Sequence, residues 1–374
     1  MPEMRLSINN EVVIPKTELD KLLAAMRQQG YQTVGPVVKH DALEYGPVET
    51  IADLPKGYTS EQNAGQYRLK QAGHDRFFDI TPGARTWKEY IYPPRRHLFT
   101  MSRDNGHWER VKVEEDLPKH ALIGVRPCEL KAIGVLDAVL VRRDFTDPDY
   151  MARRSRIFIL AVDCLHPGDT CFCVSMGSGP EAGEGYDLKM TELDDCFLIR
   201  IGSDIGLAVM QDLDWEPATA FCQQAAQRGL DHAVRSMGRQ IRDIESVPDA
   251  ILNNLEHGHW LDVSARCMSC GNCTFVCPTC FCWDAVDEVS VTTKETSRYR
   301  VWDSCFNLAY SAQAGGNTRP STKSRYRQWL SHKFGNWQKQ FDVLGCVGCG
   351  RCITWCPAGI DVTEEVKVFQ EVSS

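Results

Sequence analysis

The sequence lacks long apolar runs and a positive net charge. No stretch reaches the roughly 18 consecutive apolar residues that a membrane helix requires, and the segment from Met1 to Val13 has no apolar run of signal-peptide length. The 374 residues carry a formal net charge of -8 at pH 7, which argues against a general nucleic-acid binder. We therefore expect a cytoplasmic protein with no membrane span and no nucleic-acid partner.

The sequence also lacks a catalytic constellation that can be defended from its residues. The segment Gly177–Ala182 matches G-x-G-x-x-A on paper, but it does not lie between a strand and a helix, as a dinucleotide-binding turn would. Pro180 and Glu181 do not suit a turn that binds phosphate, so we interpret this segment as a loop. No catalytic residue is predicted in the chain.

Cysteine, by contrast, is abundant. The chain has 17 cysteines, and without a secretory signal they indicate metal ligands rather than disulfides. Two runs, Cys267–Pro278 and Cys346–Pro357, have the spacing C-x2-C-x2-C-x3-C-P, which holds a [4Fe–4S] cluster. Gly271 and Gly350 follow the second cysteine of each run and should let backbone N–H groups approach the sulfurs.

The fourth cysteine of each run is expected to serve the other cluster, as it does in two-cluster ferredoxins. By this rule the first cluster is held by Cys267, Cys270, Cys273 and Cys356, and the second by Cys346, Cys349, Cys352 and Cys277. Structural zinc is the alternative, but zinc sites usually pair two C-x2-C units over a longer gap. Two complete four-cysteine runs, each followed by proline, favour iron–sulfur.

A second group of cysteines follows a predicted βαβ unit. The apolar runs Ala121–Val125 and Ile157–Val162 predict buried strands, with a helical pattern from Glu129 to Val141 between them. Parallel strands of such a unit end at the same edge of the sheet. The cysteines that follow these ends are Cys128, Cys164, Cys171 and Cys173.

This convergence predicts a third [4Fe–4S] cluster at the sheet edge. Four neighbouring thiols would be exposed to oxidation unless a metal centre held them. Cys128 is also expected at a helix N-terminus, which favours the thiolate form. The alternatives are a structural zinc at the same four thiols and a set of inert, buried cysteines.

The chain is expected to have an α+β fold with two domains. Residues 1–245 should form an α/β domain with a partly parallel sheet and the third site, and residues 246–374 a mostly helical, ferredoxin-like domain. The large insertion at residues 279–345 is expected to be a helical elaboration around the clusters. Cys280 and Cys282 directly follow a cluster ligand and should pack beside a cluster, Cys305 is left without a role, and Cys196 and Cys222 should lie in the core.

The insertion also holds a basic segment. Its cations can form a solvated helix face, or they can lie near the anionic clusters and raise their potentials or dock an acidic partner. The residues concerned are Arg319, Lys323, Arg325, Arg327, Lys333 and Lys339.

Six motifs carry a resemblance to a known family. In chain order they are Gly124–Cys128 (GVRPC), Asp169–Cys173 (DTCFC), Cys277–Cys282 (CPTCFC), Trp302–Cys305 (WDSC), Ala314–Arg319 (AGGNTR) and Cys346–Cys352 (CVGCGRC). As a set they resemble the beta subunit of cytoplasmic [NiFe] hydrogenases (sulfhydrogenases) and the related A-type subunit of anaerobic sulfite reductase. The resemblance runs from about Leu122 to Asp361, which is most of the chain.

The resemblance implies an iron–sulfur subunit that transfers electrons and has no catalytic site of its own. In such complexes a companion subunit binds FAD and NAD(P)H, and the hydrogenase small and large subunits bear the Ni–Fe centre. The beta-type subunit would pass electrons between them. Two alternatives stay open: the A-type electron-transfer subunit of a sirohaem anaerobic sulfite reductase, and a stand-alone ferredoxin-like carrier or redox sensor.

Overall fold

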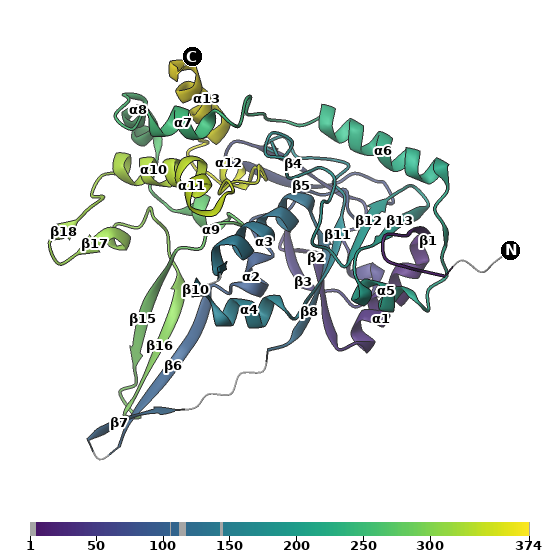
Figure 1. The fold of residues 1–374 in the computed structure, drawn as a ribbon, viewed down its shortest axis with the longest axis horizontal. Coiled ribbons are helices and arrows are strands. Elements are labelled where there is room, and N and C mark those ends of the chain that lie inside the picture. Colours follow the sequence, from purple (N-terminus) through teal and green to yellow (C-terminus); the bar gives the residue numbers. More distant parts are fainter. Residues whose placement is uncertain (1–4, 105, 112–116, 143–144, 374) are drawn as a thin grey trace.

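The fold is α+β, as the sequence predicted, and combines a sheet, a helical region and a projecting arm of strands (Figure 1). The computed structural model describes residues 5–104, 106–111, 117–142 and 145–373. None of the helices in these ranges is long and apolar enough to cross a membrane. The helices are α1 (Leu19–Gln28), α2 (Lys88–Ile91), α3 (Pro127–Leu140), α4 (Pro148–Arg154), α5 (Asp204–Met210), α6 (Ala220–Arg235), α7 (Val247–Leu252), α8 (His259–Arg266), α9 (Asn272–Phe275), α10 (Thr322–Ser331), α11 (Trp337–Phe341), α12 (Arg351–Thr354) and α13 (Val362–Ser373).

The main sheet has eight strands and is partly parallel. Strand β8 pairs in parallel with β2 and β11, and β11 pairs in parallel with β12, whereas the outer pairs are antiparallel. Helix α3 connects β8 to β11, so the predicted βαβ unit is confirmed. In spatial order the strands are β14 (Glu216–Pro217), β1 (Glu11–Pro15), β13 (Cys196–Ile201), β12 (Leu188–Glu192), β11 (Ile157–Val162), β8 (Lys119–Val125), β2 (Tyr31–Lys39) and β3 (Ala42–Pro47).

Strand β11 is apolar throughout because both faces of the sheet are covered. Phe158, Leu160 and Val162 belong to the core that also contains residues of α1 and α5. Ile159 and Ala161 face the opposite core, where α3 packs. Successive side chains of a strand alternate between faces, so a strand covered on both sides reads as a continuous apolar run.

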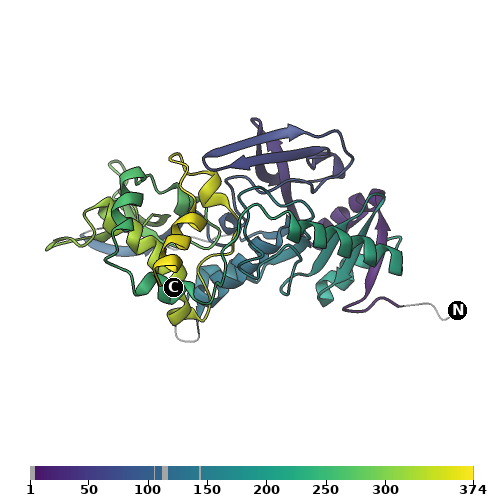
Figure 2. The same cartoon turned by 90° about the horizontal axis from the view of Figure 1, so that it is seen from above.

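The helical region gathers around both cysteine runs. Its core contains aromatic side chains of α8, α10 and α13, among them Trp260, Trp329 and Phe369. Seen from above, this region lies beside the eight-stranded sheet, and the hairpin of β4 (Tyr58–Asn63) and β5 (Gln66–Gln71) lies over their junction (Figure 2). Two shorter strand pairs complete the fold: β9 (Val141–Arg142) with β10 (Phe145–Thr146), and β17 (Ala312–Gln313) with β18 (Gly316–Asn317).

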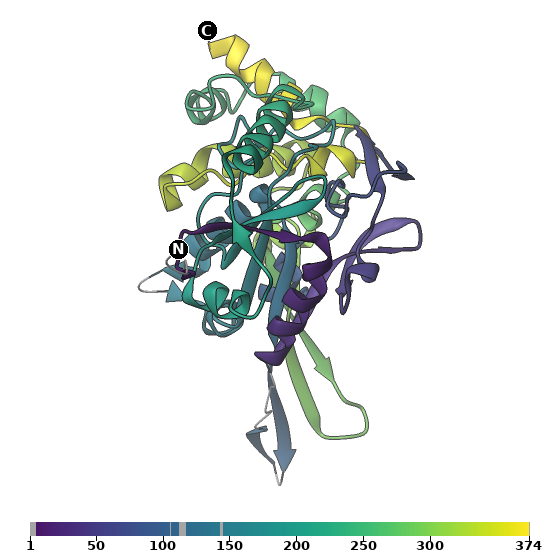
Figure 3. The ribbon, with the colours of Figure 1, turned by 90° about the vertical axis from the view of Figure 1, so that its right-hand side faces the viewer.

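A four-stranded antiparallel arm projects from the molecule (Figures 1 and 3). Its strand order is β15 (Trp283–Val289), β16 (Glu295–Trp302), β6 (Arg95–Asp104) and β7 (His107–Val111). Strand β6 precedes residue 245 and β16 follows it, so the arm joins strands from both sides of the predicted domain boundary.

The hairpin β15–β16 corrects the expectation of a helical insertion. Helices α10 and α11 follow it, but residues 283–302 form strands instead. Every residue of β15 is exposed, and Asp287 lies opposite Arg298 with a 2.7 Å ion pair between them. The hairpin therefore depends on cross-strand pairs rather than on a buried face, and no apolar alternation announces it in the sequence.

A buried carboxylate ties a loop to the main sheet. Glu192, at the end of β12, accepts hydrogen bonds from the backbone N–H groups of Phe77 and Phe78 at 3.0 and 2.8 Å. It also pairs with the Lys16 ammonium at 3.0 Å and is only 4% exposed. Without the carboxylate, these donors would lack their partner in the protein interior.

Replacing Glu192 by Ala should therefore lower the free energy of unfolding by roughly 3–5 kcal/mol, the usual loss when one partner of a buried pair is removed. The matched control is Asp287→Asn, which removes one partner of the exposed Asp287–Arg298 pair. Chemical denaturation followed by circular dichroism compares the two variants. Equal midpoints for Glu192→Ala and Asp287→Asn would contradict the stabilising role of the buried carboxylate.

Candidate metal centres

The two cysteine runs adopt the same local structure. Gly271 and Gly350 have φ angles of 77° and 73°, and each precedes a short helix, α9 or α12. These helices carry the third cysteine of each run, Cys273 and Cys352. Glycine adopts this left-handed conformation without steric cost, so the repeated glycine produces a repeated fold. The sequence repeat is thus also a structural repeat.

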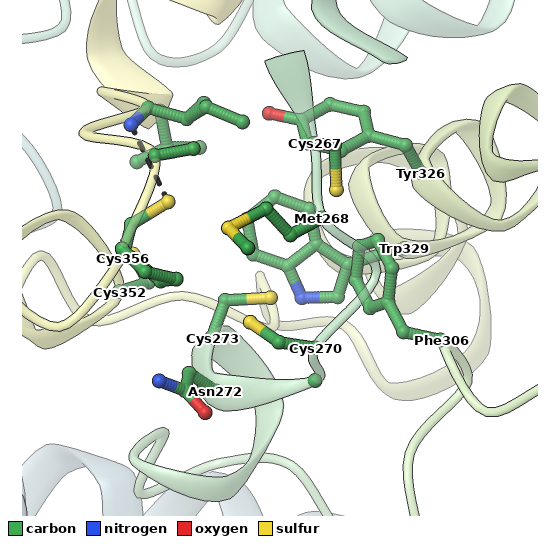
Figure 4. A pocket seen from close by; sticks show the side chains of 15 residues that line it. Cys267, Met268, Cys270, Asn272, Cys273, Phe306, Tyr326, Trp329, Cys352 and Cys356 are labelled. Carbon is green, nitrogen blue, oxygen red and sulfur yellow. Dashed lines mark hydrogen bonds between the residues drawn. The ribbon is translucent and has the colours of Figure 1, made fainter. Parts of the chain in front are cut away.

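Cysteines of both runs line the first cavity, which Figure 4 shows. Tyr326 and Trp329 supply part of its apolar wall. The backbone N–H groups of Ser269 and Ile360 donate hydrogen bonds of 3.4 Å to the sulfurs of Cys267 and Cys356, respectively. Cys356, the last cysteine of the second run, therefore lies at the same cavity as the first three cysteines of the first run. The four cysteines of the predicted first cluster that line this cavity are Cys267, Cys270, Cys273 and Cys356.

A second cavity is lined by the other predicted set of cysteines. Phe172 and Val347 contribute apolar wall, and the backbone N–H of Gly348 donates a 3.4 Å hydrogen bond to the Cys346 sulfur. Cys273 and Cys352 line both cavities, so the two lie side by side. The cysteines of the predicted second cluster that line this cavity are Cys277, Cys346, Cys349 and Cys352.

The buried thiols suit a metal cluster. Burial raises the pKa of Cys346 to about 12 and that of Cys273 well above its usual range. Such thiols stay protonated unless a metal displaces the proton. No three Cys, His, Asp or Glu side chains in the described ranges lie close enough to hold a single metal ion. A cubane cluster spreads its four thiolates more widely than one ion does, and the chemistry of these donors fits [4Fe–4S] clusters.

The third predicted set also converges, at the sheet edge that the βαβ unit creates. Burial raises the pKa of the Cys173 thiol well above its usual range, and the nearby thiols of Cys171 and Cys164 raise it further. The Cys128 thiol interacts in turn with that of Cys173. Cys128 lies in the first turn of α3, directly after β8, and Cys164 follows β11. The four residues therefore come together from two strand ends and one loop.

Two effects oppose each other at the Cys128 thiol. Burial raises the pKa of Cys128 well above its usual range, and the neighbouring thiols of Cys349 and Cys173 raise it further. Desolvation of the charged form therefore acts against the effect of the helix N-terminus. A bound metal would again be needed to hold this thiol as thiolate.

The loop of the third set packs directly on the second cysteine run. The backbone N–H of Phe172 donates to the carbonyl oxygen of Gly348 at 2.8 Å, and the Ser178 hydroxyl donates to that of Val347 at 2.6 Å. A Cβ at Gly350 would lie 2.5 Å from the carbonyl oxygen of Thr170. Gly350 therefore also permits this close approach of two loops, which the sequence did not reveal.

A buried ion pair fastens the same junction. Arg351 follows Gly350 in the second run, and Glu129 follows Cys128 in α3. Their side chains are 2.7 Å apart and almost completely buried. The Tyr45 hydroxyl donates to the same carboxylate at 2.9 Å. This pair holds the third cysteine set against the second.

Comparison with known proteins identifies the family. Residues 266–360 match the model of the 4Fe–4S dicluster domain. The chain is 33% identical over 339 residues to sulfhydrogenase 2 subunit beta of Pyrococcus furiosus, a match that covers 88% of this chain and 96% of that protein. The chain belongs to the family of sulfhydrogenase beta subunits. Comparison with solved structures gives no match.

Membership of the sulfhydrogenase beta-subunit family confirms the resemblance carried by the six motifs. The 4Fe–4S dicluster domain spans the cysteines of both cavities. The third set, at residues 128–173, lies outside the matched range. Sequence and family together therefore establish 4Fe–4S clusters in this chain.

Two buried lysines beside the second cavity were not assigned from the sequence. Lys333 is 6% exposed, and its ammonium donates to the Cys277 sulfur at 3.3 Å and to the Gly345 carbonyl oxygen at 2.6 Å. Lys88 donates to the carbonyl oxygens of Cys277 and Cys280 at 2.9 and 2.8 Å. Lys333 could be suspected from the basic segment, whereas nothing near Lys88 in the sequence marks it.

The basic segment thus divides between the two interpretations. Lys333 and Arg325 are buried, and Arg325 donates to the hydroxyl of Ser269 beside the first cavity. Lys339 is exposed, and Arg327 pairs at 2.7 Å with the exposed Glu256. Some of these cations lie near the cysteine sites and others form a solvated surface.

Replacing Lys333 by Met should lower the reduction potential of the second cluster, because a cation that donates to a ligand sulfur favours the more negative, reduced state. A charge-assisted hydrogen bond is worth roughly 1.5–3 kcal/mol, so the shift should be on the order of 100 mV at most. Redox titration followed by electron paramagnetic resonance measures it. Lys339→Met is the matched control, and equal potentials in both variants would rule out the tuning role.

Proposed function

We propose that this chain is the electron-relay subunit of a cytoplasmic [NiFe] hydrogenase complex. The observation that carries the proposal is the continuity of the cysteine sets. The first cavity shares Cys273 and Cys352 with the second, and the third set packs on the run that lines the second. Two further observations support the proposal. The chain belongs to the sulfhydrogenase beta-subunit family, and its seventeen cysteines are free of disulfides and so available as metal ligands.

The ligand sets follow from the two cavities and the sheet edge. We assign the first cluster to Cys267, Cys270, Cys273 and Cys356, and the second to Cys346, Cys349, Cys352 and Cys277. Each assignment is supported by a cavity that contains all four thiols, including the one contributed by the other run. The third cluster is assigned to Cys128, Cys164, Cys171 and Cys173.

Iron is favoured over zinc at the third set by its surroundings. The thiol of Cys171 lies 3.8 Å from the carbonyl oxygen of Cys349 and interacts with the Cys349 thiol, a ligand of the second cluster. Zinc would satisfy the same four thiols but would carry no electrons. An iron–sulfur cluster here would extend the path into the N-terminal domain, residues 1–245, and link it to the ferredoxin-like domain, residues 246–374.

The protein's own residues would hold and insulate the electron path. [4Fe–4S] clusters supply one-electron transfer, with potentials set by burial and by hydrogen bonds to sulfur. The apolar walls of Tyr326, Trp329 and Phe172 keep water from the cavities. Backbone N–H groups and the Lys333 ammonium donate to ligand sulfurs, which offsets their negative charge.

The two ends of this path would face different partners. We propose that one partner binds FAD and NAD(P)H, and that the other is the pair of [NiFe] hydrogenase small and large subunits. Cys270 is exposed and its neighbour Met268 is 69% exposed, so the first cluster would lie near the surface. Electrons could then pass from a docked partner without crossing the protein interior.

Purification of the native complex under anaerobic conditions tests this proposal. Co-purification with a flavoprotein and with nickel-containing subunits is the expected result. Sirohaem in the complex would instead assign the chain to a sulfite reductase, as its A-type electron-transfer component. Isolation as a lone monomer would favour a stand-alone ferredoxin-like carrier or redox sensor.

Replacing Cys356 by Ala should damage the first cluster, although Cys356 lies in the second run. The reason is its place in the first cavity beside Cys267. Electron paramagnetic resonance of the reduced protein should match that of Cys267→Ala rather than that of Cys346→Ala. A spectrum that matches Cys346→Ala would refute the exchange of ligands between runs.

If all three sets hold a [4Fe–4S] cluster, the chain should contain about twelve iron atoms, four for each cluster. Replacing Cys171 by Ala should remove about four of them and leave the spectra of the first two clusters unchanged. Iron and zinc are counted in the anaerobically reconstituted protein, with Cys222→Ala as the control. About eight irons and one zinc in the wild type, or no loss of iron in Cys171→Ala, would end the three-cluster assignment.

A further inference from the structure

A polar cavity lies between helix α6 and one face of the main sheet. The apolar residues of β12 and β13 face the core that contains residues of α1 and α5. The residues between them face the opposite side, because side chains alternate along a strand, and there α6 packs against β13. This side is not a closed core: Cys196 of β13 and Cys222 of α6, which were expected in the core, are half-buried. A cavity of about 220 Å³ remains between the helix and the strands.

Three charged side chains form a row across this face of the sheet. Lys189 of β12 is opposite Arg200 of β13, and Arg200 is opposite Glu11 of β1. All three residues line the cavity. Two cations that are directly opposite each other on neighbouring strands destabilise a sheet. Each cation of the row therefore needs an anionic partner.

Lys189 has anionic partners within the protein. Its ammonium lies 2.6 Å from the Glu181 carboxylate and 3.9 Å from the Asp163 carboxylate. Asp163 also accepts hydrogen bonds from the Ala182 backbone N–H at 2.7 Å and from the Thr191 hydroxyl at 2.6 Å. The charges of Lys189 and Asp163 are therefore balanced without a ligand.

Arg200 has a weaker partner. Its Nη1 lies 3.9 Å from Oε1 of Glu11, which is beyond hydrogen-bond distance, and Oε2 of Glu11 accepts a 2.8 Å hydrogen bond from the Gln223 side chain. The buried Nε of Arg200 has no hydrogen-bond partner among the residues that the structure describes. A buried donor without a partner is unfavourable, so this guanidinium is suited to bind a carboxylate that enters the cavity.

The surroundings of Arg200 define the rest of the ligand. An α-amino acid carries its ammonium on the carbon next to its carboxylate. If the carboxylate binds Arg200, the ammonium lies close to the neighbouring carboxylate, which is Glu11. Leu198, Ala226 and Leu230 give the cavity a buried apolar wall. The volume is below the roughly 300–1,000 Å³ of pockets for drug-sized ligands, so the ligand must be small.

We propose that the cavity between α6 and the sheet binds a small α-amino acid with an apolar side chain. The carboxylate of the amino acid pairs with Arg200, its ammonium pairs with Glu11, and its side chain packs on the apolar wall. Asp163 lines the cavity and directly precedes Cys164, so the amino acid lies near the third cysteine set. The site goes beyond the proposed electron relay and does not depend on it.

Anaerobic isothermal titration calorimetry of the full-length, cluster-loaded chain tests the site, with L-leucine as the probe. Two analogues separate the roles of its charged groups: isocaproate lacks the ammonium, and isoamylamine lacks the carboxylate. Leucine should bind, and each analogue should bind roughly tenfold or more weakly, because it leaves one charged group of the protein without its partner.

Four variants test whether leucine binds in this cavity. Arg200→Met should weaken leucine binding roughly tenfold or more, because the partner of the carboxylate is lost. Glu11→Gln should weaken the binding of leucine but not that of isocaproate. Ala226→Phe keeps both charged groups and should weaken leucine binding because the larger side chain fills the cavity. Arg228→Met is the matched control, since Arg228 is exposed on α6 and does not line the cavity.

Three results would overturn the amino-acid site. The first is that leucine, valine and methionine all fail to bind to the wild type. The second is equal affinity for leucine and isocaproate, which would make the ligand a simple carboxylate. The third is an unchanged affinity for leucine in both Arg200→Met and Ala226→Phe, which would place the leucine elsewhere. The iron content of the same samples is measured separately, so a failure of the relay is distinguished from a failure of this site.

Discussion

The structure depends on burying many thiol groups in a small volume. An unpaired thiolate in the protein interior is unfavourable, and burial accordingly raises the pKa of most of these cysteines, among them Cys352. A metal centre makes buried thiolates favourable because it replaces the protons of the thiols and takes up the negative charge. The buried cations Lys333 and Arg351 also offset the negative charge of the thiolates, since each interacts with thiols of the second cavity. Packing around the cysteine runs is therefore inseparable from metal binding.

The same constraint explains how distant parts of the chain are held together. Cys356 lines a cavity with the first run, and Cys277 lines one with the second, so each run needs the other. The N-terminal part is attached through Gly350 and the buried Glu129–Arg351 pair. Loss of one cluster should for this reason disturb more than its own loop. The proposed path for electrons would follow this same continuous core.

Much of this could be predicted because the relevant signals are local. Cysteine spacing indicated both runs, and two apolar runs on either side of a helical pattern indicated the parallel strands β8 and β11. Long-range contacts of single side chains left no such signal. Lys88 meets Cys277 across 189 positions, and the exposed strand β15 has no buried face. The helix N-terminus at Cys128 was identified correctly, but the burial that raises the pKa of its thiol comes from long-range packing that the sequence does not show.

We propose that three neighbouring sets of four cysteines hold iron. Anomalous diffraction from anaerobic crystals, recorded on both sides of the iron absorption edge, tests it most directly. We expect three iron peaks: one among Cys267, Cys270, Cys273 and Cys356, one among Cys277, Cys346, Cys349 and Cys352, and one among Cys128, Cys164, Cys171 and Cys173. Two iron peaks with a zinc signal at the third set, or a peak that excludes Cys356 or Cys277 from the opposite run, would contradict it.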